Sequence, residues 1–238
     1  MRHNYALIIP ALNEAESIGI LLGTVSRELF SQIIVVDNGS RDRTAEVAAI
    51  AGAEVVAEYR RGYGQACLSG LRQLHPAVSA VAFMDADLSD DPGDLERLVS
   101  HFDGNQWDLV LGSRVLDTPE PGSLKAIQRF GNWLSTRLIK LLWHVQFTDL
   151  GPMRIVRRDS LARLNMRDRT FGWTVEMQVR AAQLRLRVCE IPVSYRRRLH
   201  GRSKVSGTIW GSLRAGVGIL WAILRCCLLP VWVSSPER

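Results

Sequence analysis

Short apolar runs alternate with helical patterns through the first 113 residues of the chain. The apolar runs lie at 5–9, 33–36, 54–57, 78–84 and 109–112. In the segments between them, apolar residues recur every three or four positions, as on one face of a helix. Strands that alternate with helices in this way predict βαβ units and a mostly parallel sheet with helices on both faces. The sequence therefore predicts an α/β fold.

After residue 113 the alternation becomes less regular. Residues 123–143 and 173–184 have helical patterns, and residues 188–195 alternate like a strand. The chain contains no internal repeat, low-complexity tract or clear linker. We therefore expect one main domain over residues 1–207, followed by an amphipathic helix and tail over 208–238.

Polar and acidic residues follow three of the predicted strands. Asn13 and Glu14 follow the first, Asp37 ends the second, and Asp85 and Asp87 follow the fourth. Parallel strands bring such residues to one edge of a sheet, where open α/β sheets bind ligands. Residues spaced i, i+2 on an extended chain point to the same side. The last two carboxylates thus favour a site for Mg²⁺ or Mn²⁺ carrying a diphosphate over the alternative, a solvated loop.

Asn13 also has the position of a helix N-cap. Glu16 lies three residues later, as in a capping box, and apolar residues then recur at helical spacing. The sequence therefore predicts a helix that starts directly after Asn13.

The charge of the chain points to an anionic partner. Its 30 Lys and Arg residues exceed its 24 Asp and Glu residues, which gives a formal net charge of +6. The four cysteines have neither metal-ligand spacing nor a disulfide pattern, and the first apolar run is too short for the core of a signal peptide. We expect a cytoplasmic protein with reduced cysteines.

Five motifs in order carry a resemblance to a known family. They are Pro10-x-x-Asn13-Glu14, Val36-Asp37-Asn38-Gly39-Ser40, Asp85-Ala86-Asp87, Gly112-Ser113-Arg114 and Gly201-Arg202-Ser203-Lys204. This set resembles the family 2 glycosyltransferases, and within them the branch with dolichyl-phosphate mannose synthase and dolichyl-phosphate glucose synthase. The resemblance implies a GT-A type fold and Mg²⁺ or Mn²⁺ as cofactor. It also implies inverting transfer of a hexose from a nucleotide-diphosphate sugar, of the UDP-glucose or GDP-mannose class, to a polyprenyl (dolichyl or undecaprenyl) phosphate.

The resemblance also implies roles for individual residues. The nucleotide-sugar would be bound by Pro10, Ala11, Asn13, Glu14, Asp37, Gly64, Asp85, Ala86 and Asp87. Asp85 and Asp87 would hold the metal, with Asp87 the more direct ligand. The acceptor phosphate would be bound by Arg114, Arg129, Arg198, Arg202 and Lys204. The catalytic carboxylates would be Asp87, Asp149 and Glu176.

The chain departs from the family pattern at three places. Asn38 stands where many relatives have a second Asp, and Ser89 stands where the mannose-synthase branch offers a Gln to the metal. The loop at 149–154 looks more like the glucose-type and bacterial members. The donor sugar therefore stays open.

The acceptor decides whether the reaction needs a base. A phosphate monoester is already mostly ionised near neutral pH, because its second pKa is about 6. The basic segment 196–204 supplies arginine and lysine side chains of the kind that bind phosphate. A soluble hydroxyl acceptor is the alternative, and it would need Asp149 or Glu176 as base.

The apolar C-terminal segment, 205–232, predicts a helix at a membrane surface. Arg225 near its middle would cost roughly 2.5–3.5 kcal/mol in a bilayer-spanning helix. Trp210, Arg214, Trp221 and Arg225 fall within about a 60° arc of a helix, as side chains at a lipid headgroup boundary do. We expect peripheral association with the inner face of the membrane; packing on the sheet or in a homodimer is the alternative.

Three other classes of protein fit the sequence less well. Residues 62–67 form only part of a dinucleotide-binding glycine motif and do not follow the first strand. A phosphatase with an Asp-x-Asp nucleophile usually carries it at the first strand, unlike Asp85. Aromatic residues make up 7% of the chain, and the tryptophans concentrate late in it, so nucleic acid is not expected as a partner.

Overall fold

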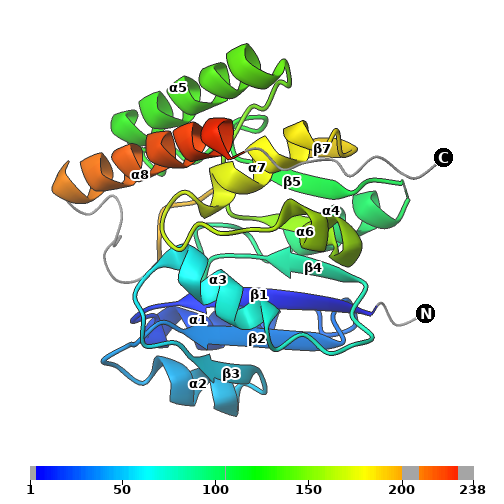
Figure 1. Ribbon diagram of the computed structural model, residues 1–238. Helices are drawn as coiled ribbons and strands as arrows, with labels where there is room; N and C mark the ends of the chain where they lie inside the picture. The colour runs from blue at the N-terminus through cyan, green and yellow to red at the C-terminus, as the bar shows by residue number, and fades with distance from the viewer. Residues whose placement is uncertain (1–3, 105, 200–208, 230–238) are drawn as a thin grey trace.

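The computed structural model describes residues 4–104, 106–199 and 209–229, with the side chains of the last segment described from Ala215 onward (Figure 1). The strands are β1 (Tyr5–Ala11), β2 (Gln32–Asp37), β3 (Glu54–Ala57), β4 (Ala80–Phe83), β5 (Leu109–Ser113), β6 (Arg154–Arg157) and β7 (Val188–Pro192). The helices are α1 (Ala15–Thr24), α2 (Thr44–Ile50), α3 (Tyr63–Leu71), α4 (Asp94–Asp103), α5 (Ala126–Trp143), α6 (Arg158–Leu164), α7 (Trp173–Gln183) and α8 (Ile209–Leu228).

All seven of these strands form one sheet in the order β3-β2-β1-β4-β6-β5-β7. Every pair is parallel except the two made by β6, which is antiparallel to both β4 and β5. The predicted mostly parallel α/β sheet is confirmed. The chain runs from β1 outward to β2 and β3, and then returns to place β4 on the other side of β1. The carboxyl ends of β1, β2 and β4 therefore flank a switch in strand order, where α/β proteins bind ligands.

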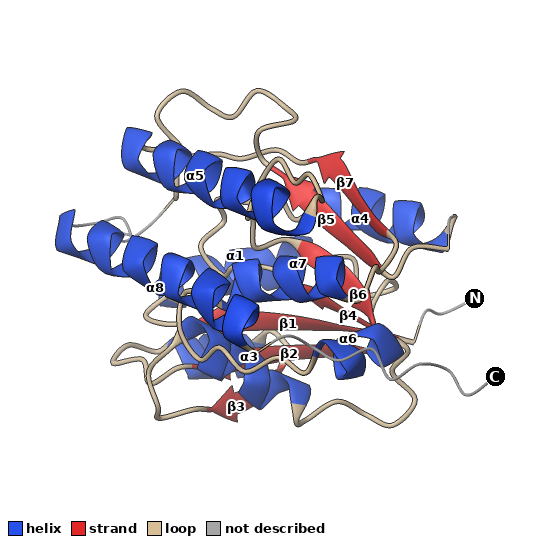
Figure 2. Ribbon diagram, turned by 45° about the horizontal axis from the view of Figure 1, so that its top comes forward, coloured by secondary structure: helices blue, strands red, loops and turns tan. Residues whose placement is uncertain are grey.

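Helices cover both faces of the sheet because its strands are apolar on both sides (Figure 2). In β1, Ile8 packs into a core that includes residues of α3 and α7. The neighbouring Leu7 and Ile9 point the other way, into a core with residues of α1 and α4. All three side chains are fully buried. The rigid, two-sided packing fixes the positions of the loops that follow the strands.

The start of α1 differs from its prediction. Glu14, and not Asn13, is the N-cap, and no side chain caps the helix in the predicted way. Asn13 has a φ of 52°, and its side-chain oxygen accepts a hydrogen bond from the Arg41 N–H at 2.7 Å. The Ala15 N–H instead donates to Asp42 at 3.2 Å. The predicted capping box is wrong because the loop after β2 provides the acceptors for the helix start.

The C-terminal helix α8 packs against α7 and lies beside α5 in both views (Figures 1 and 2). Ala215, Ala222 and Cys226 are buried on its inner side. The predicted position of Arg225 at a headgroup boundary is wrong, because its guanidinium turns inward to Asp168 and Glu176. The expected domain boundary at residues 207 and 208 lies outside the described residues. None of the described helices has the length and apolar character needed to cross a bilayer.

Candidate active site

The carboxyl ends of β1 and β4 bring three predicted site residues into contact. Glu14 follows β1, and Asp87 follows β4. The Arg198 guanidinium lies between them, 2.8 Å from Glu14 Oε1 and 2.7 Å from Asp87 Oδ2. All three side chains are largely buried, so these contacts are charge-assisted hydrogen bonds with little competition from water. Arg198 was expected at the acceptor phosphate, and here it neutralises carboxylates of the donor and metal position.

Asp85 is the more enclosed member of the acidic pair. Burial, and next the charge of Asp87, raise the pKa of Asp85 to about 7, although a hydrogen bond from Tyr63 acts in the opposite direction. Its Oδ1 is buried and has no hydrogen-bond partner among the described residues. An orphaned carboxylate oxygen is costly unless a proton or a cation satisfies it. This atom therefore fits a metal ligand.

Asp87 is held in place by the turn that follows it. Its Oδ1 accepts a hydrogen bond from the Ser89 N–H at 2.9 Å. Leu88 between them has a φ of 60°, which turns the chain sharply. Among the described residues, no third histidine, cysteine or carboxylate forms a metal cluster with this pair. A metal at Asp85 and Asp87 would take its remaining ligands from water and from a diphosphate.

The loops after β2 and β3 are joined by Asn38. Its side-chain oxygen accepts from the Gly62 N–H at 2.9 Å, and its amide donates to the carbonyl oxygens of Glu58 and Arg60. An ionised Asp could not donate the last two bonds. The departure from the family pattern at Asn38 thus has a structural purpose. Asp37 lies beside it and accepts a hydrogen bond from the Ser40 N–H.

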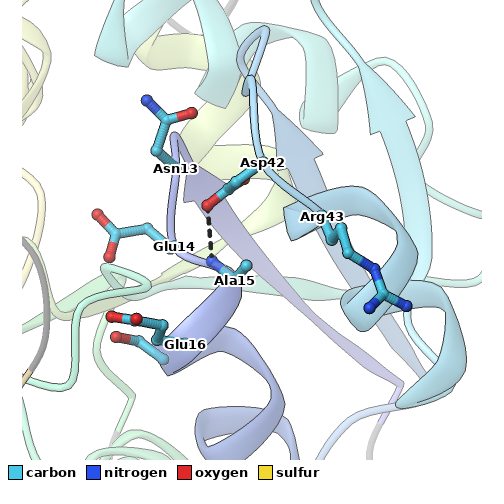
Figure 3. Close-up of a pocket in the computed structure, with 7 residues that line it drawn as sticks. Asn13, Glu14, Ala15, Glu16, Asp42 and Arg43 are labelled. Atoms are coloured by element: carbon cyan, nitrogen blue, oxygen red, sulfur yellow. Dashed lines mark hydrogen bonds between the residues drawn. The ribbon is translucent and has the colours of Figure 1, made fainter.

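A pocket of about 330 Å³ opens at the start of α1, next to Glu14 (Figure 3). It is lined by Asn13, Glu14, Ala15, Glu16, Ser17, Asp42 and Arg43. Figure 3 shows the hydrogen bond from Ala15 to Asp42 across it. This pocket lies at the end of the predicted nucleotide-binding loop. The other predicted residues of that loop, Pro10 and Ala11, form the end of β1, and Ala86 is buried between the two aspartates.

Gly64 contacts protein backbone at the start of α3. Its N–H donates to the Thr170 carbonyl at 3.1 Å, and a Cβ added to it would lie 2.1 Å from the Asp168 carbonyl oxygen. At Gly62, which has a φ of 147°, a Cβ would lie 2.1 Å from the Arg169 carbonyl oxygen. Only glycine allows the loop at 168–170 to approach this closely.

A Gly64→Ala substitution should therefore destabilise the protein by about 1–3 kcal/mol, because the added methyl group overlaps backbone that cannot easily move. The control is Gly131→Ala in α5, where an added Cβ meets nothing within 4 Å. That change should stabilise by about 0.5–1 kcal/mol through helix propensity alone. Urea unfolding of both variants checks the pair, and equal midpoints would contradict the packing argument.

Arg114 and Asp149 form a buried bidentate ion pair. Arg114 Nε lies 2.7 Å from Asp149 Oδ2, and Nη2 lies 2.8 Å from Oδ1. The Arg114 guanidinium also lies 5.0 Å from the centre of the Tyr195 ring. Burial opposes ionisation of Asp149, but the charge and hydrogen bonds of Arg114 outweigh it and hold the Asp149 pKa below its usual value. Asp149 is thus a fixed anion, only 2% exposed, in this structure.

The loop that carries Asp149 is held by residues on three other elements. Glu190 of β7 accepts hydrogen bonds from the Thr148 and Asp149 N–H groups. Asn132 of α5 accepts from the Leu150 N–H, and Gln178 of α7 donates to the Asp149 carbonyl oxygen. These long-range partners keep Asp149 at the end of β5 beside Arg114.

The structure does not bring Glu176 to this cluster. Its side chain is fully buried in α7, and its oxygens accept from the Arg167 and Asp168 N–H groups and from Arg180 and Arg225. None of these partners belongs to the Asp85 site. The catalytic role of Glu176 therefore stays a prediction; in this structure α7 turns the carboxylate toward Arg225 of α8.

The remaining predicted phosphate-binding residues are exposed or lie outside the described residues. Arg129 is exposed on α5. Arg202 and Lys204 lie outside the described residues. The acceptor-binding roles of all three stay predictions.

Two further residues belong to the cluster and were not predicted from the sequence. Asp90 is 1% exposed, and neither of its carboxylate oxygens has a hydrogen-bond partner among the described residues. Burial, and next the charge of Asp85, raise the pKa of Asp90 well above its usual value. Tyr195 pairs with it through backbone and covers Arg114. The only signal for Asp90 was its place in the acidic run after β4; Tyr195 had none.

A mostly parallel sheet with carboxylates gathered at a switch in strand order is typical of α/β proteins that bind a ligand, often a nucleotide, at that point. The family model described as "Glycosyl transferase family 2" matches residues 6–164. The chain belongs to glycosyltransferase family 2, and it is a glycosyltransferase.

Two glycosyltransferases illustrate the similarity in sequence. An uncharacterised glycosyltransferase of Mycobacterium tuberculosis is 40% identical over 210 residues, which cover 88% of this chain and 93% of that protein. An undecaprenyl-phosphate mannosyltransferase of Micrococcus luteus is 29% identical and covers 93% of this chain and 97% of its own length.

Solved structures share the GT-A type fold. The glucosyl-3-phosphoglycerate synthase of Mycobacterium tuberculosis, in complex with Mn²⁺, UDP and glucosyl-3-phosphoglycerate, superimposes with a TM-score of 0.74. It is 21% identical, and the match covers 96% of this chain and 81% of that one. The predicted fold class is thereby confirmed.

Proposed function

We propose that this glycosyltransferase is metal-dependent and inverting, and that it moves a hexose from a nucleotide-diphosphate sugar to a polyprenyl phosphate at a membrane surface. It acts on the cytoplasmic side, with α5 and α8 against the lipid. The proposal is supported by a pair of carboxylates suited to a metal, by the engagement of both predicted bases, Asp149 and Glu176, with arginines, and by an apolar helical face.

Asp85 and Asp87 would bind Mg²⁺ or Mn²⁺ together with the donor diphosphate. The support is the orphaned Asp85 Oδ1 and the donor set of carboxylate oxygens, which suits a hard divalent cation. Mn²⁺ and UDP are bound in the solved glucosyl-3-phosphoglycerate synthase. Such an ion would stabilise negative charge on the departing nucleotide. The nucleoside would then bind to Glu14, Asp37 and the pocket at the start of α1.

The observation that carries the choice of acceptor is the state of Asp149. A general base needs a free oxygen within reach of the acceptor and a pKa near the working pH. Asp149 has a lowered pKa, and both of its oxygens are occupied by Arg114 and by backbone N–H groups. Glu176 is fully buried and bound to arginines. A phosphate acceptor, which arrives ionised, needs neither of them.

A lipid-bound acceptor is supported by the exposed sides of α5 and α8, called here the apolar face. Its side chains, each at least 40% exposed, are Ile127, Phe130, Trp133, Leu141, Leu142, Val217, Leu220, Trp221, Leu224 and Leu228. Neither helix contains an acidic residue. Exposed Arg129, Arg137 and Lys140 add positive charge on α5. Aromatic and apolar side chains combined with cations suit an anionic lipid surface.

The alternative is that a second copy of the chain covers the apolar face in a homodimer. The charge favours lipid, because two copies would bring the cations of α5 toward each other, whereas anionic headgroups would neutralise them. The name of the Micrococcus luteus relative, an undecaprenyl-phosphate mannosyltransferase, also agrees with a lipid acceptor.

A soluble acceptor is the second candidate function. It is favoured by the phosphoglycerate product bound in the solved structure that shares the fold. In that case a hydroxyl would attack, and Asp149 would have to leave Arg114 to serve as base.

An acceptor assay separates the two candidates. UDP-glucose and GDP-mannose are offered with Mn²⁺, together with either a polyprenyl phosphate in phosphatidylglycerol-containing vesicles or 3-phosphoglycerate in solution. The hexose of the donor is labelled. We expect it to be transferred to the polyprenyl phosphate and to be extracted with that lipid into the organic phase. Transfer to 3-phosphoglycerate alone would contradict the proposal.

The apolar face gives a sharper prediction. A Trp133→Glu/Trp221→Glu variant should lose vesicle binding and transfer to polyprenyl phosphate by about tenfold or more, since burying each apolar side chain contributes roughly 1.5–3 kcal/mol. Donor binding should be unchanged. The control, Ile50→Glu, alters a side chain that is 78% exposed on α2, on another part of the surface. Equal transfer by both variants would remove the lipid role of this face.

A further inference from the structure

A buried ion cluster joins α8 to the body of the protein. Arg225 Nη2 lies 3.3 Å from Asp168 Oδ2 and 3.2 Å from Glu176 Oε1. Arg180 also contacts Glu176, at 3.0 Å. Asp168, Glu176 and Arg180 are each at most 4% exposed. Two acidic and two basic groups balance, so loss of Arg225 would leave one buried negative charge unmatched.

The same carboxylates shape the segment that precedes α7. Glu176 Oε2 accepts hydrogen bonds from the Arg167 and Asp168 N–H groups, at 2.9 and 2.6 Å. Asp168 Oδ1 accepts from the Thr170 N–H at 2.7 Å. At Gly172, an added Cβ would lie 2.5 Å from the Ala222 Cβ of α8. The conformation of residues 167–170 thus depends on groups that Arg225 neutralises.

The carbonyl groups of this segment in turn accept hydrogen bonds from the start of α3. The Gly64 and Gln65 N–H groups donate to the Thr170 and Arg169 carbonyl oxygens, at 3.1 and 3.0 Å. Directly before the helix, the Gly62 N–H donates to the Asn38 side-chain oxygen at 2.9 Å. Tyr63, the first residue of the helix, lies close enough to Asp85 to act on the pKa of that carboxyl. A series of contacts therefore runs from α8 to the start of α3, next to the predicted metal ligand.

We propose that Arg225 is a positioning residue for the metal and donor site. It holds the segment at 167–170, which sets the start of α3 and with it the Tyr63 hydroxyl against Asp85. The metal part rests on the proposed function.

The test compares Arg225→Gln with Arg225→Lys, which keeps the charge. The first readout is the binding of Mn²⁺ alone, measured from the electron paramagnetic resonance signal of the free ion. Arg225→Gln should weaken it by about fivefold or more, and Arg225→Lys should recover part of the loss. Arg187→Gln is the control, because it removes a half-exposed ion pair with Asp108.

A double-mutant cycle with Tyr63→Phe tests whether Arg225 acts on the metal site through Tyr63. If Arg225 acts through Tyr63, the two substitutions together should weaken Mn²⁺ binding little more than either alone. Fully additive losses would show that Arg225 does not act through Tyr63. Unchanged Mn²⁺ binding in Arg225→Gln, with normal binding by the wild type, would overturn the proposal.

Hydrogen exchange at the Gly64 and Gln65 amides provides a readout that needs no metal. Arg225→Gln should speed their exchange by about fivefold or more relative to Arg187→Gln, because their acceptors at 169 and 170 lose support. Unchanged exchange would overturn the proposal even if the wild-type protein binds no Mn²⁺. A wild type that binds no Mn²⁺ would by itself count against the proposed function.

Discussion

An Asp87→Asn variant should keep its fold and lose about 1000-fold in transfer rate. The substitution removes one of two carboxylates that would hold the metal and donor diphosphate, and charge stabilisation of this kind contributes several kcal/mol. It also removes one anionic partner of Arg198, whose guanidinium lies 2.7 Å from Asp87 Oδ2 and 2.8 Å from Glu14 Oε1. Steady-state transfer with Mn²⁺ and each donor sugar measures the loss, and circular dichroism checks the fold.

Asp91→Asn is the matched control. Asp91 lies four residues further along the same acidic run, but its partner is Arg196, in a pair that is more exposed to solvent. This substitution should change the rate less than threefold. If Asp87→Asn retained more than a tenth of the wild-type rate, or if Asp91→Asn were equally damaging, the assignment of the metal site would be wrong.

The second large effect concerns stability. An Arg114→Met variant should lose about 3–5 kcal/mol of unfolding free energy, because it leaves the Asp149 carboxylate buried without its counter-charge. Urea unfolding at pH 7 measures this. Arg187→Met, which breaks a half-exposed pair with Asp108, should cost less than about 1 kcal/mol.

A double variant, Arg114→Met/Asp149→Leu, separates charge from packing. Removing both partners should restore a large part of the stability, because no unpaired buried charge remains. If Arg114→Met were as stable as the wild type and raised only the KM for the acceptor, Arg114 would act as a phosphate ligand, as the sequence suggested, and not as the partner of Asp149.

The sequence was informative where local pattern and topology coincide. Asn13, Asp37 and Asp85 lie at or just after the ends of the apolar runs that form β1, β2 and β4, and parallel pairing places those strand ends together whatever the rest of the chain does. The edge of the sheet that bears the carboxylates could therefore be predicted from alternation alone.

Long-range partners could not be predicted in the same way. Arg198 and Glu14 are 184 residues apart, and no local pattern specifies their contact. The strand β6 was missed because it is four residues long, with two arginines at its ends, and pairs with β4 and β5 only in the folded protein. The burial of Glu176 depends on arginines of α7 and α8, and the pattern of helical residues does not predict these contacts.

The apolar face on α5 and α8 also has a practical consequence for preparing the protein. In plain buffer its ten exposed apolar side chains face water, and each pair of copies that covers them gains free energy. Self-association should therefore rise with concentration and fall when a mild detergent coats the helices. The apparent size in size-exclusion chromatography would then depend on the protein concentration and the detergent as much as on the oligomeric state in the cell.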